Sequence, residues 1–217
     1  MKKEIKYTIW GGVGVFFLLA IFKRKSIMHT LFDKQKLITT ALQEYKHWNN
    51  GAKKENTPEM IDKLKEYWNA AGIKSWSDEK MRNEAWSAAF ISYLMKKANA
   101  GTNFKYSPSH SVFIREAIKN KKEESDNPFK AYKPSEVKLN VGDIIAYPRQ
   151  SGVNYDTITD YASHSDVVVQ IKNGIAKTIG GNVANTVSAT SVYLTKDGKI
   201  DTERNKKKYF VVIKSDN

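Results

Sequence analysis

The chain has 217 residues, of which 41% are hydrophobic and 12% aromatic. This composition is sufficient for a folded core and argues against a wholly disordered chain. It contains no cysteine, so disulfides, thiolate zinc sites and cysteine nucleophiles are excluded. The net charge of +13 is uneven, because residues 1–55 carry 11 basic and only 4 acidic side chains. Such a bias suits an anionic membrane surface or a polyanion, or a lysine-rich soluble surface.

The first feature along the chain is an uncharged apolar stretch, "YTIWGGVGVFFLLAIF", at residues 7–22. Basic residues flank it on both sides: Lys2, Lys3 and Lys6 before it, and Lys23, Arg24 and Lys25 after it. At about 1.5 Å per residue a helix here is roughly 24 Å long, slightly shorter than a bilayer core. We expect an uncleaved membrane anchor in residues 1–25. The alternatives are a buried hydrophobic helix and a segment held inside a larger assembly.

Helical periodicity dominates the part of the chain that follows the anchor. It predicts helices over residues 26–50, from residue 58 to about residue 71, over 84–99 and over 110–120. The first of them, with the break that follows it, makes residues 26–57 a helical, basic connector.

Beyond residue 140 the hydrophobic pattern changes to that of β-strands. Strands are expected at residues 141–149, 165–174, 175–183, 185–194 and 207–215. "KNG" is a turn signal between the second and third of them. Helices followed by consecutive strands predict an α+β domain with an antiparallel sheet, spanning residues 58–217.

Ser87 stands at the start of the apolar helix predicted over residues 84–99. A hydroxyl at this place is a helix cap, a core residue or a nucleophile. The N–H groups of a helix N-terminus either receive a cap or stabilise a developing oxyanion. A serine nucleophile also needs a base within hydrogen-bond reach, because the helix dipole alone does not ionise it.

His164 is the candidate base, at the beginning of the strand "SHSDVVVQI". Asp166, two residues later, points to the same face of that strand. Asn182, at the end of "IGGN", comes close to His164 if the two strands form a hairpin. Asn182 and Asp166 are therefore alternative groups to orient the imidazole ring.

A second histidine, His110, lies in "YSPSHSVF" before a helix. It is either a capping or packing residue or a group that lines a cleft, with Tyr106 and Ser107 beside it. Trp86, next to Ser87, is either core or a cleft wall. No metal-ligand pattern and no phosphate-binding glycine loop is present, so no metal or organic cofactor is indicated.

Several of these segments together resemble a known group of proteins. "WSAAFISYLMKKANAG" resembles the nucleophile helix of papain-fold cell-wall peptidases and amidases of the NlpC-like and CHAP-like groups, which read Trp-Cys-Ala-Ala-Phe. "VGDIIAY", "SHSDVVVQI" and "IGGNVANTVS" are similar to their successive strands. The chain most resembles DUF2272, a bacterial family of unknown function with serine in "WSAAF" and a "YSPSH"-like segment. The resemblance covers about residues 58–214.

The resemblance implies a papain-like fold and hydrolysis of an amide in the peptide part of peptidoglycan. Ser87 would occupy the nucleophile position, His164 that of the base, and Asn182 or Asp166 that of the orienting group. Trp86, Tyr106, Ser107 and His110 would contact substrate. The sequence departs from the papain-like pattern in one respect, because Ser87 has a hydroxyl where those enzymes have a thiol. This hydroxyl must lose its proton during attack, as in a serine hydrolase.

A membrane-anchored protein whose domain faces the cell wall is the expectation that follows. The alternative is a catalytically inactive wall-binding or assembly component of a secretion or phage-like injection apparatus. Charge alone would allow nucleic-acid binding, but no recognised basic motif accompanies it, so no specific nucleic-acid partner is expected.

Overall fold

The computed structural model describes residues 31–215. The anchor expected at residues 7–22 lies outside them, as does the beginning of the connector. Among the described residues, no helix combines the length and the apolar character that crossing a membrane requires.

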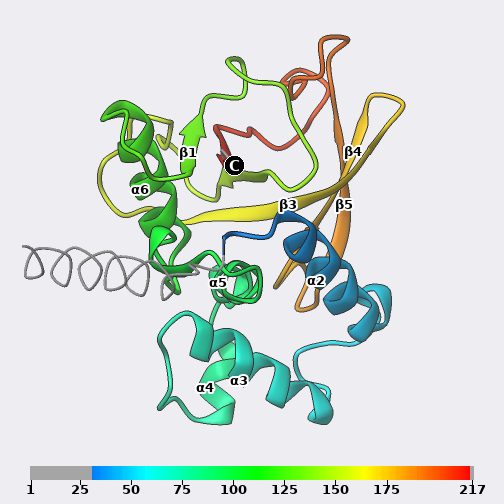
Figure 1. The fold of residues 1–217 in the computed structure, drawn as a ribbon. Helices are drawn as coiled ribbons and strands as arrows, with labels where there is room; N and C mark the ends of the chain where they lie inside the picture. Colours follow the sequence, from blue (N-terminus) through cyan, green and yellow to red (C-terminus); the bar gives the residue numbers. More distant parts are fainter. Residues whose placement is uncertain (1–30, 216–217) are drawn as a thin grey trace, which may run out of the picture. The chain divides into compact units, whose positions relative to one another are not determined.

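The helices come first in the chain, as the sequence predicted (Figure 1). The α-helices are α2 (Lys34–His47), α3 (Ile61–Ala70), α4 (Asp78–Asn83), α5 (Ser87–Lys97) and α6 (His110–Lys122). Single 3-10 turns lie at Asn49–Gly51, Pro58–Met60 and Gly101–Asn103. Side-chain caps start two of the helices: Asp33 accepts from the Lys36 N–H, and Ser77 from the Lys80 N–H. The short helix α4 was not predicted.

The strands form one six-stranded antiparallel sheet in the order β1-β6-β2-β3-β4-β5. They are β1 (Phe129–Tyr132), β2 (Ile144–Pro148), β3 (Ser163–Lys172), β4 (Ile175–Gly180), β5 (Ser188–Tyr193) and β6 (Val211–Ser215). The α+β class and the order of helices before an antiparallel sheet are therefore confirmed. The sequence did not predict β1, whose four residues are too few for a visible alternation.

The turn between β3 and β4, together with a bulge in β3, fixes the register on which the site depends. Asn173 and Gly174 both have positive φ, of 52° and 71°, as a two-residue type I′ hairpin requires. The turn pairs Lys172 with Ile175, and a bulge between Val168 and Gln170 then shifts the register by one residue, so that Val167 pairs with Ile179. Continued towards the open end of the hairpin, the same register brings Gly180 opposite Asp166.

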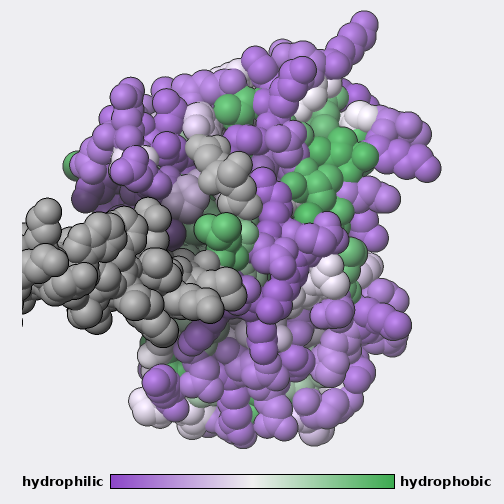
Figure 2. Space-filling model, in the orientation of Figure 1, coloured by the Kyte–Doolittle hydropathy of each residue, from purple (hydrophilic) through white to green (hydrophobic). Residues whose placement is uncertain are grey.

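The sheet has a hydrophobic cluster on each face. Val167 and Val169 of β3 belong to the larger cluster, which also contains buried hydrophobic residues of α2, α5 and α6. Val168 belongs to the second cluster, with Ile145 and Val212. Since side chains alternate along a strand, His164 and Asp166 share the face of Val168. In the view of Figure 2 the surface is mostly hydrophilic, with a hydrophobic patch around β4 and β5 and a smaller one near the centre of the view.

One buried carboxylate, that of Glu44, ties the helices together. Glu44 accepts hydrogen bonds from the Tyr67 hydroxyl, from the Tyr93 hydroxyl at 3.0 Å and from the Lys63 ammonium at 3.0 Å. The Trp48 indole N–H donates in turn to the Tyr67 oxygen at 2.9 Å. Burial and the negative charge of Glu44 raise the pKa of Tyr67, so this phenol stays a donor.

Candidate active site

Ser87 is the first residue of α5, and it does not cap the helix. The capping position belongs to Trp86, which makes no side-chain capping bond. Trp86 is fully buried, stacks on Trp48 at 5.1 Å between ring centroids and donates its indole N–H to Glu55 at 2.8 Å. This placement makes Trp86 a core residue that anchors the start of α5, the first of the two expected roles.

The hydroxyl of Ser87 is hydrogen-bonded to a histidine, and the histidine is His110. Ser87 Oγ lies 2.7 Å from His110 Nε2, and each residue is only 5% exposed. His110 is the first residue of α6, so two helix N-termini meet at this contact. The expected hydrogen bond between Ser87 and His164 is therefore replaced by one to the histidine that the sequence had placed at the edge of the site.

His164 is held by other groups, which explains why it does not bond to Ser87. Its Nε2 lies 2.8 Å from Asp166 Oδ1, and its Nδ1 lies 3.5 Å from Arg149 Nη2. Arginine only donates, so this geometry assigns the Nδ1 lone pair to Arg149 and the Nε2 proton to Asp166. Both His164 and Asp166 are almost fully buried.

The two histidines are neighbours within one cluster. The ring centroids of His110 and His164 are 5.6 Å apart, with the planes inclined at 51°. Ser87, His110, His164 and Asp166 are called the Ser–His cluster below. The cluster forms where the first turns of α5 and α6 meet the beginning of β3.

The protonation of His110 suits a hydrogen-bond acceptor. Burial lowers its pKa well below the usual value, and the neighbouring His164 and Arg149 groups disfavour a charge on the ring further. A neutral ring accepts the Ser87 proton at Nε2 and carries its own proton at Nδ1. Within the described part of the chain, His110 Nδ1 has no hydrogen-bond partner although it is buried.

Asp166 is ionised in the same surroundings. Burial by itself would raise the pKa of this carboxyl, but the hydrogen bond from His164 and the positive charges of Lys207 and Arg149 lower it overall. Oδ1 is the atom bonded to His164, whereas Oδ2 is buried with no hydrogen-bond partner among residues 31–215. Of the two orienting groups expected, Asp166 is the one in contact with the ring.

No hydrogen bond joins Asn182 to His164 in the described part of the chain, and the backbone gives the reason. β4 ends at Gly180, and Asn182 then adopts a left-handed conformation with φ of 53°. The register of the hairpin therefore does not continue as far as Asn182. Gly180 approaches the pair instead, because a Cβ on this residue would overlap Asp166 Oδ1 and lie 2.8 Å from His164 Nε2.

Tyr106 and Ser107 belong to the segment that leads into α6. The backbone N–H and C=O of Ser107 bond to the Ser92 hydroxyl of α5 at 3.1 and 3.0 Å. The Ser107 hydroxyl accepts from the backbone N–H of Ser109 at 3.0 Å. These bonds fix the start of α6 against α5 and so position His110. Tyr106 is half-buried beside Phe104.

The start of α5 also supplies hydrogen-bond donors. The first backbone bond within this helix runs from the Phe90 N–H to the Trp86 carbonyl at 2.9 Å. The N–H groups of Ser87, Ala88 and Ala89 come before it, and helix geometry gives them no acceptor within α5. The positive end of the helix dipole therefore lies next to the Ser87 hydroxyl.

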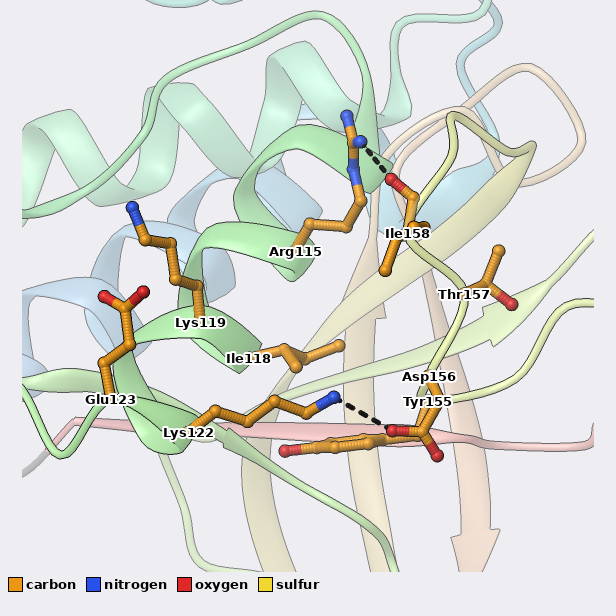
Figure 3. A pocket seen from close by; sticks show the side chains of 9 residues that line it. All are labelled: Arg115, Ile118, Lys119, Lys122, Glu123, Tyr155, Asp156, Thr157 and Ile158. Atoms are coloured by element: carbon orange, nitrogen blue, oxygen red, sulfur yellow. Dashed lines mark hydrogen bonds and ion pairs between the residues drawn. The ribbon is translucent and has the colours of Figure 1, made fainter.

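A pocket of about 280 Å³ lies on another side of α6 (Figure 3). Its charged groups largely satisfy one another: Arg115 donates to the Ile158 carbonyl, and Lys122 forms a 3.0 Å ion pair with Asp156. None of its lining residues belongs to the Ser–His cluster. It is therefore a separate feature of the surface.

Sequence reasoning missed Arg149 and Gly180. Arg149 follows directly on β2, where the pairing of Tyr147 with His164 brings it near the ring. The sequence feature that could have revealed Arg149 is the basic residue in "YPR", at the end of a predicted strand. Gly180 is the first glycine of "GGN", and nothing else in the sequence indicates that it packs against the site.

Fold and site together define an α+β domain in which a buried serine–histidine pair joins two helix N-termini beside a histidine–aspartate pair. The chain belongs to the family described as "Uncharacterized protein conserved in bacteria (DUF2272)", whose model matches residues 44–214. Comparison with curated proteins gave no match, and neither did comparison with solved structures.

Proposed function

We propose that the protein is a serine hydrolase of papain-like, NlpC/CHAP-like type that cleaves amide bonds in the peptide part of peptidoglycan. The observation that carries this proposal is the 2.7 Å hydrogen bond between Ser87 Oγ and His110 Nε2. It supplies what a serine nucleophile needs, namely a base whose lone pair already receives the hydroxyl proton. The peptidoglycan substrate is taken from the sequence resemblance.

In the proposed reaction, Ser87 Oγ attacks the amide carbonyl carbon while His110 Nε2 takes the hydroxyl proton. Free N–H groups in the first turn of α5 stabilise the oxyanion. His110 then gives the proton to the departing amine as the C–N bond breaks, which leaves an acyl ester on Ser87. Water, deprotonated by the same ring, hydrolyses the ester and restores the hydroxyl.

His164 and Asp166 act in this proposal as positioning residues. The His164 ring lies beside that of His110, at 5.6 Å between the imidazole centroids, and Asp166 holds it there through their 2.8 Å hydrogen bond. Burial, with His164 and Arg149 nearby, disfavours a charge on His110. His164 as the base, which the sequence predicts, is the competing assignment. It requires His164 to leave Arg149 and turn its Nδ1 towards Ser87.

The proposal is tested by incubating purified peptidoglycan with the protein and following the release of new amino groups. Ser87→Ala should abolish release while leaving folding and wall binding nearly unchanged, because the hydroxyl caps no helix. Ser87→Cys is the informative companion, since a thiol at a helix N-terminus beside a histidine ionises more readily. Release that persists in Ser87→Ala would disprove the assignment of the nucleophile.

A second candidate function is non-catalytic: a wall-binding or assembly component of a secretion or phage-like injection apparatus. The observation that favours it is the 5% exposure of both Ser87 and His110, which leaves a substrate little room to reach them. In the assay above, no release from wild type together with release from Ser87→Cys would indicate a dormant site and favour this role.

For the cellular location, we propose a membrane anchor at residues 7–22 that leaves the domain facing the cell wall. The sixteen uncharged residues between basic clusters support it. The full chain should then sediment with membranes, and residues 26–217 should stay in solution as a folded domain. A truncated chain that aggregates, while the full chain is soluble without detergent, would contradict the anchor.

A further inference from the structure

Arg149 brings an exposed guanidinium to the buried Ser–His cluster. The residue follows β2 and is exposed, yet its Nη2 lies 3.5 Å from His164 Nδ1. Its backbone is fixed, because the Arg149 N–H donates to the Ala162 carbonyl at 2.9 Å. The guanidinium therefore lies between solvent and the site.

This guanidinium has no carboxylate partner in the part of the chain that the structure describes. Other basic side chains there form ion pairs, such as Arg115 with Asp160 and Lys214 with Asp143. Asp166, the acidic residue of the cluster, is bonded to His164 instead. The contact of Arg149 with an imidazole nitrogen at 3.5 Å is long and uses only one of its five N–H donors.

An unpaired guanidinium favours one kind of ligand. Its planar fork matches a carboxylate through two parallel N–H···O bonds, which are stronger than bonds between neutral groups. A carboxylate here would also offset the positive charge that Arg149 brings near His110 and His164.

We infer that Arg149 binds a carboxylate of the peptide next to the amide that Ser87 attacks, so that the site selects peptides with a free carboxylate. The inference rests on the proposed function, because it places the peptide at the Ser–His cluster. It gives Arg149 the role of a specificity-determining residue.

The test measures binding, so that it does not depend on turnover. The full chain carrying Ser87→Ala, in detergent, is titrated with L-Ala-γ-D-Glu-L-Lys-D-Ala-D-Ala and with the same peptide whose carboxylates are all amidated. We expect the free acid to bind about tenfold more tightly or better, as for a hydrogen-bonded charged group. Arg149→Gln should reduce this ratio to about one, and Arg149→Lys should keep part of it.

The matched control is Arg204→Gln, which removes an exposed arginine stacked on Tyr193 rather than one at the cluster. It should leave the ratio unchanged, and circular dichroism should show that each variant is folded. A ratio that survives Arg149→Gln, an equal loss in Arg204→Gln, or no binding of either peptide overturns the inference. If the free acid binds more tightly than the amidated peptide as expected but the wild type hydrolyses neither, the hydrolase proposal is disproved and the carboxylate site is still supported.

Discussion

Ser87 and His110 are the first residues of two different helices, and their side chains meet at 2.7 Å. The contact depends on the tertiary arrangement, since the Ser107 backbone holds the start of α6 on the Ser92 hydroxyl of α5. Two helix N-termini thereby face one buried serine–histidine pair. The account of the protein's chemistry depends on this relationship.

If His110 is the base, its replacement should affect turnover more than that of His164. His110→Gln should lower kcat by about 10²- to 10⁴-fold, the usual contribution of a general base. His164→Gln should have a smaller effect, because that ring acts through its neighbour. Peptidoglycan hydrolysis by the two variants gives the comparison directly. The opposite ranking would restore His164 as the base.

The lowered pKa of His110 predicts how stability depends on pH. Between the folded pKa and the unfolded value of 6.5, the unfolded chain binds more protons at this residue than the folded chain does. Stability should therefore fall as the pH is lowered through 6.5, by at most about 1.4 kcal/mol per pH unit for this group.

Urea unfolding of wild type and His110→Gln between pH 7 and pH 5 measures this contribution. The variant should show a shallower loss of the free energy of unfolding. Equal slopes for the two proteins would contradict a buried neutral His110. The same depressed pKa keeps the base unprotonated, so the rate of hydrolysis should not decline until the pH is below 6.5.

Gly180→Ala should damage the His164–Asp166 pair. The new methyl group would overlap Asp166 Oδ1, and both neighbours are buried, so the strand or the pair must move. We expect a loss of about 1–3 kcal/mol in the free energy of unfolding and a fall in turnover.

Gly152→Ala is the control for that variant. It meets no atom within 4 Å, although its φ of +78° adds a small strain of about 1 kcal/mol. Both free energies of unfolding are obtained from urea titration. A Gly180→Ala variant as stable and active as the Gly152→Ala variant would contradict the close approach.

Glu44→Ala should be among the most destabilising changes outside the site. It removes the acceptor of two buried phenols and leaves the Lys63 ammonium without its buried partner. The expected loss is about 3–5 kcal/mol. Asp62→Ala on α3, whose side chain is 86% exposed, should cost less than about 1 kcal/mol. Similar midpoints for the two variants would show that the Glu44 network contributes little.

The sequence was sufficient for much of the fold because local patterns specify it. The apolar spacing around Phe90 predicted α5, and the Asn-Gly turn at residues 173–174 predicted the β3–β4 hairpin. Short helices and strands were not predicted because they have too few residues to show a hydrophobic period. β1 has four residues and α4 has six, and their positions are set by contacts with distant parts of the chain.

The site was predicted as a set of residues more accurately than as a set of contacts. The pairing of His164 with Asp166 followed from strand alternation, which is local. The partner of Ser87 depends on how α6 packs against α5, and no sequence pattern specifies that packing. The setting of Asn182 is equally non-local, because β4 ends at Gly180 and the left-handed backbone of Asn182 lies beyond the hairpin register.

Labelling of Ser87 by a serine-reactive fluorophosphonate tests the central claim most directly. The full chain is incubated with the probe, and the modified residue is located by mass spectrometry of its peptides. A nucleophile activated by His110 predicts a single adduct on Ser87 in wild type and at least a hundredfold slower labelling in His110→Gln, as expected for the loss of a general base. No adduct on Ser87, or labelling at the same rate in His110→Gln, would contradict it.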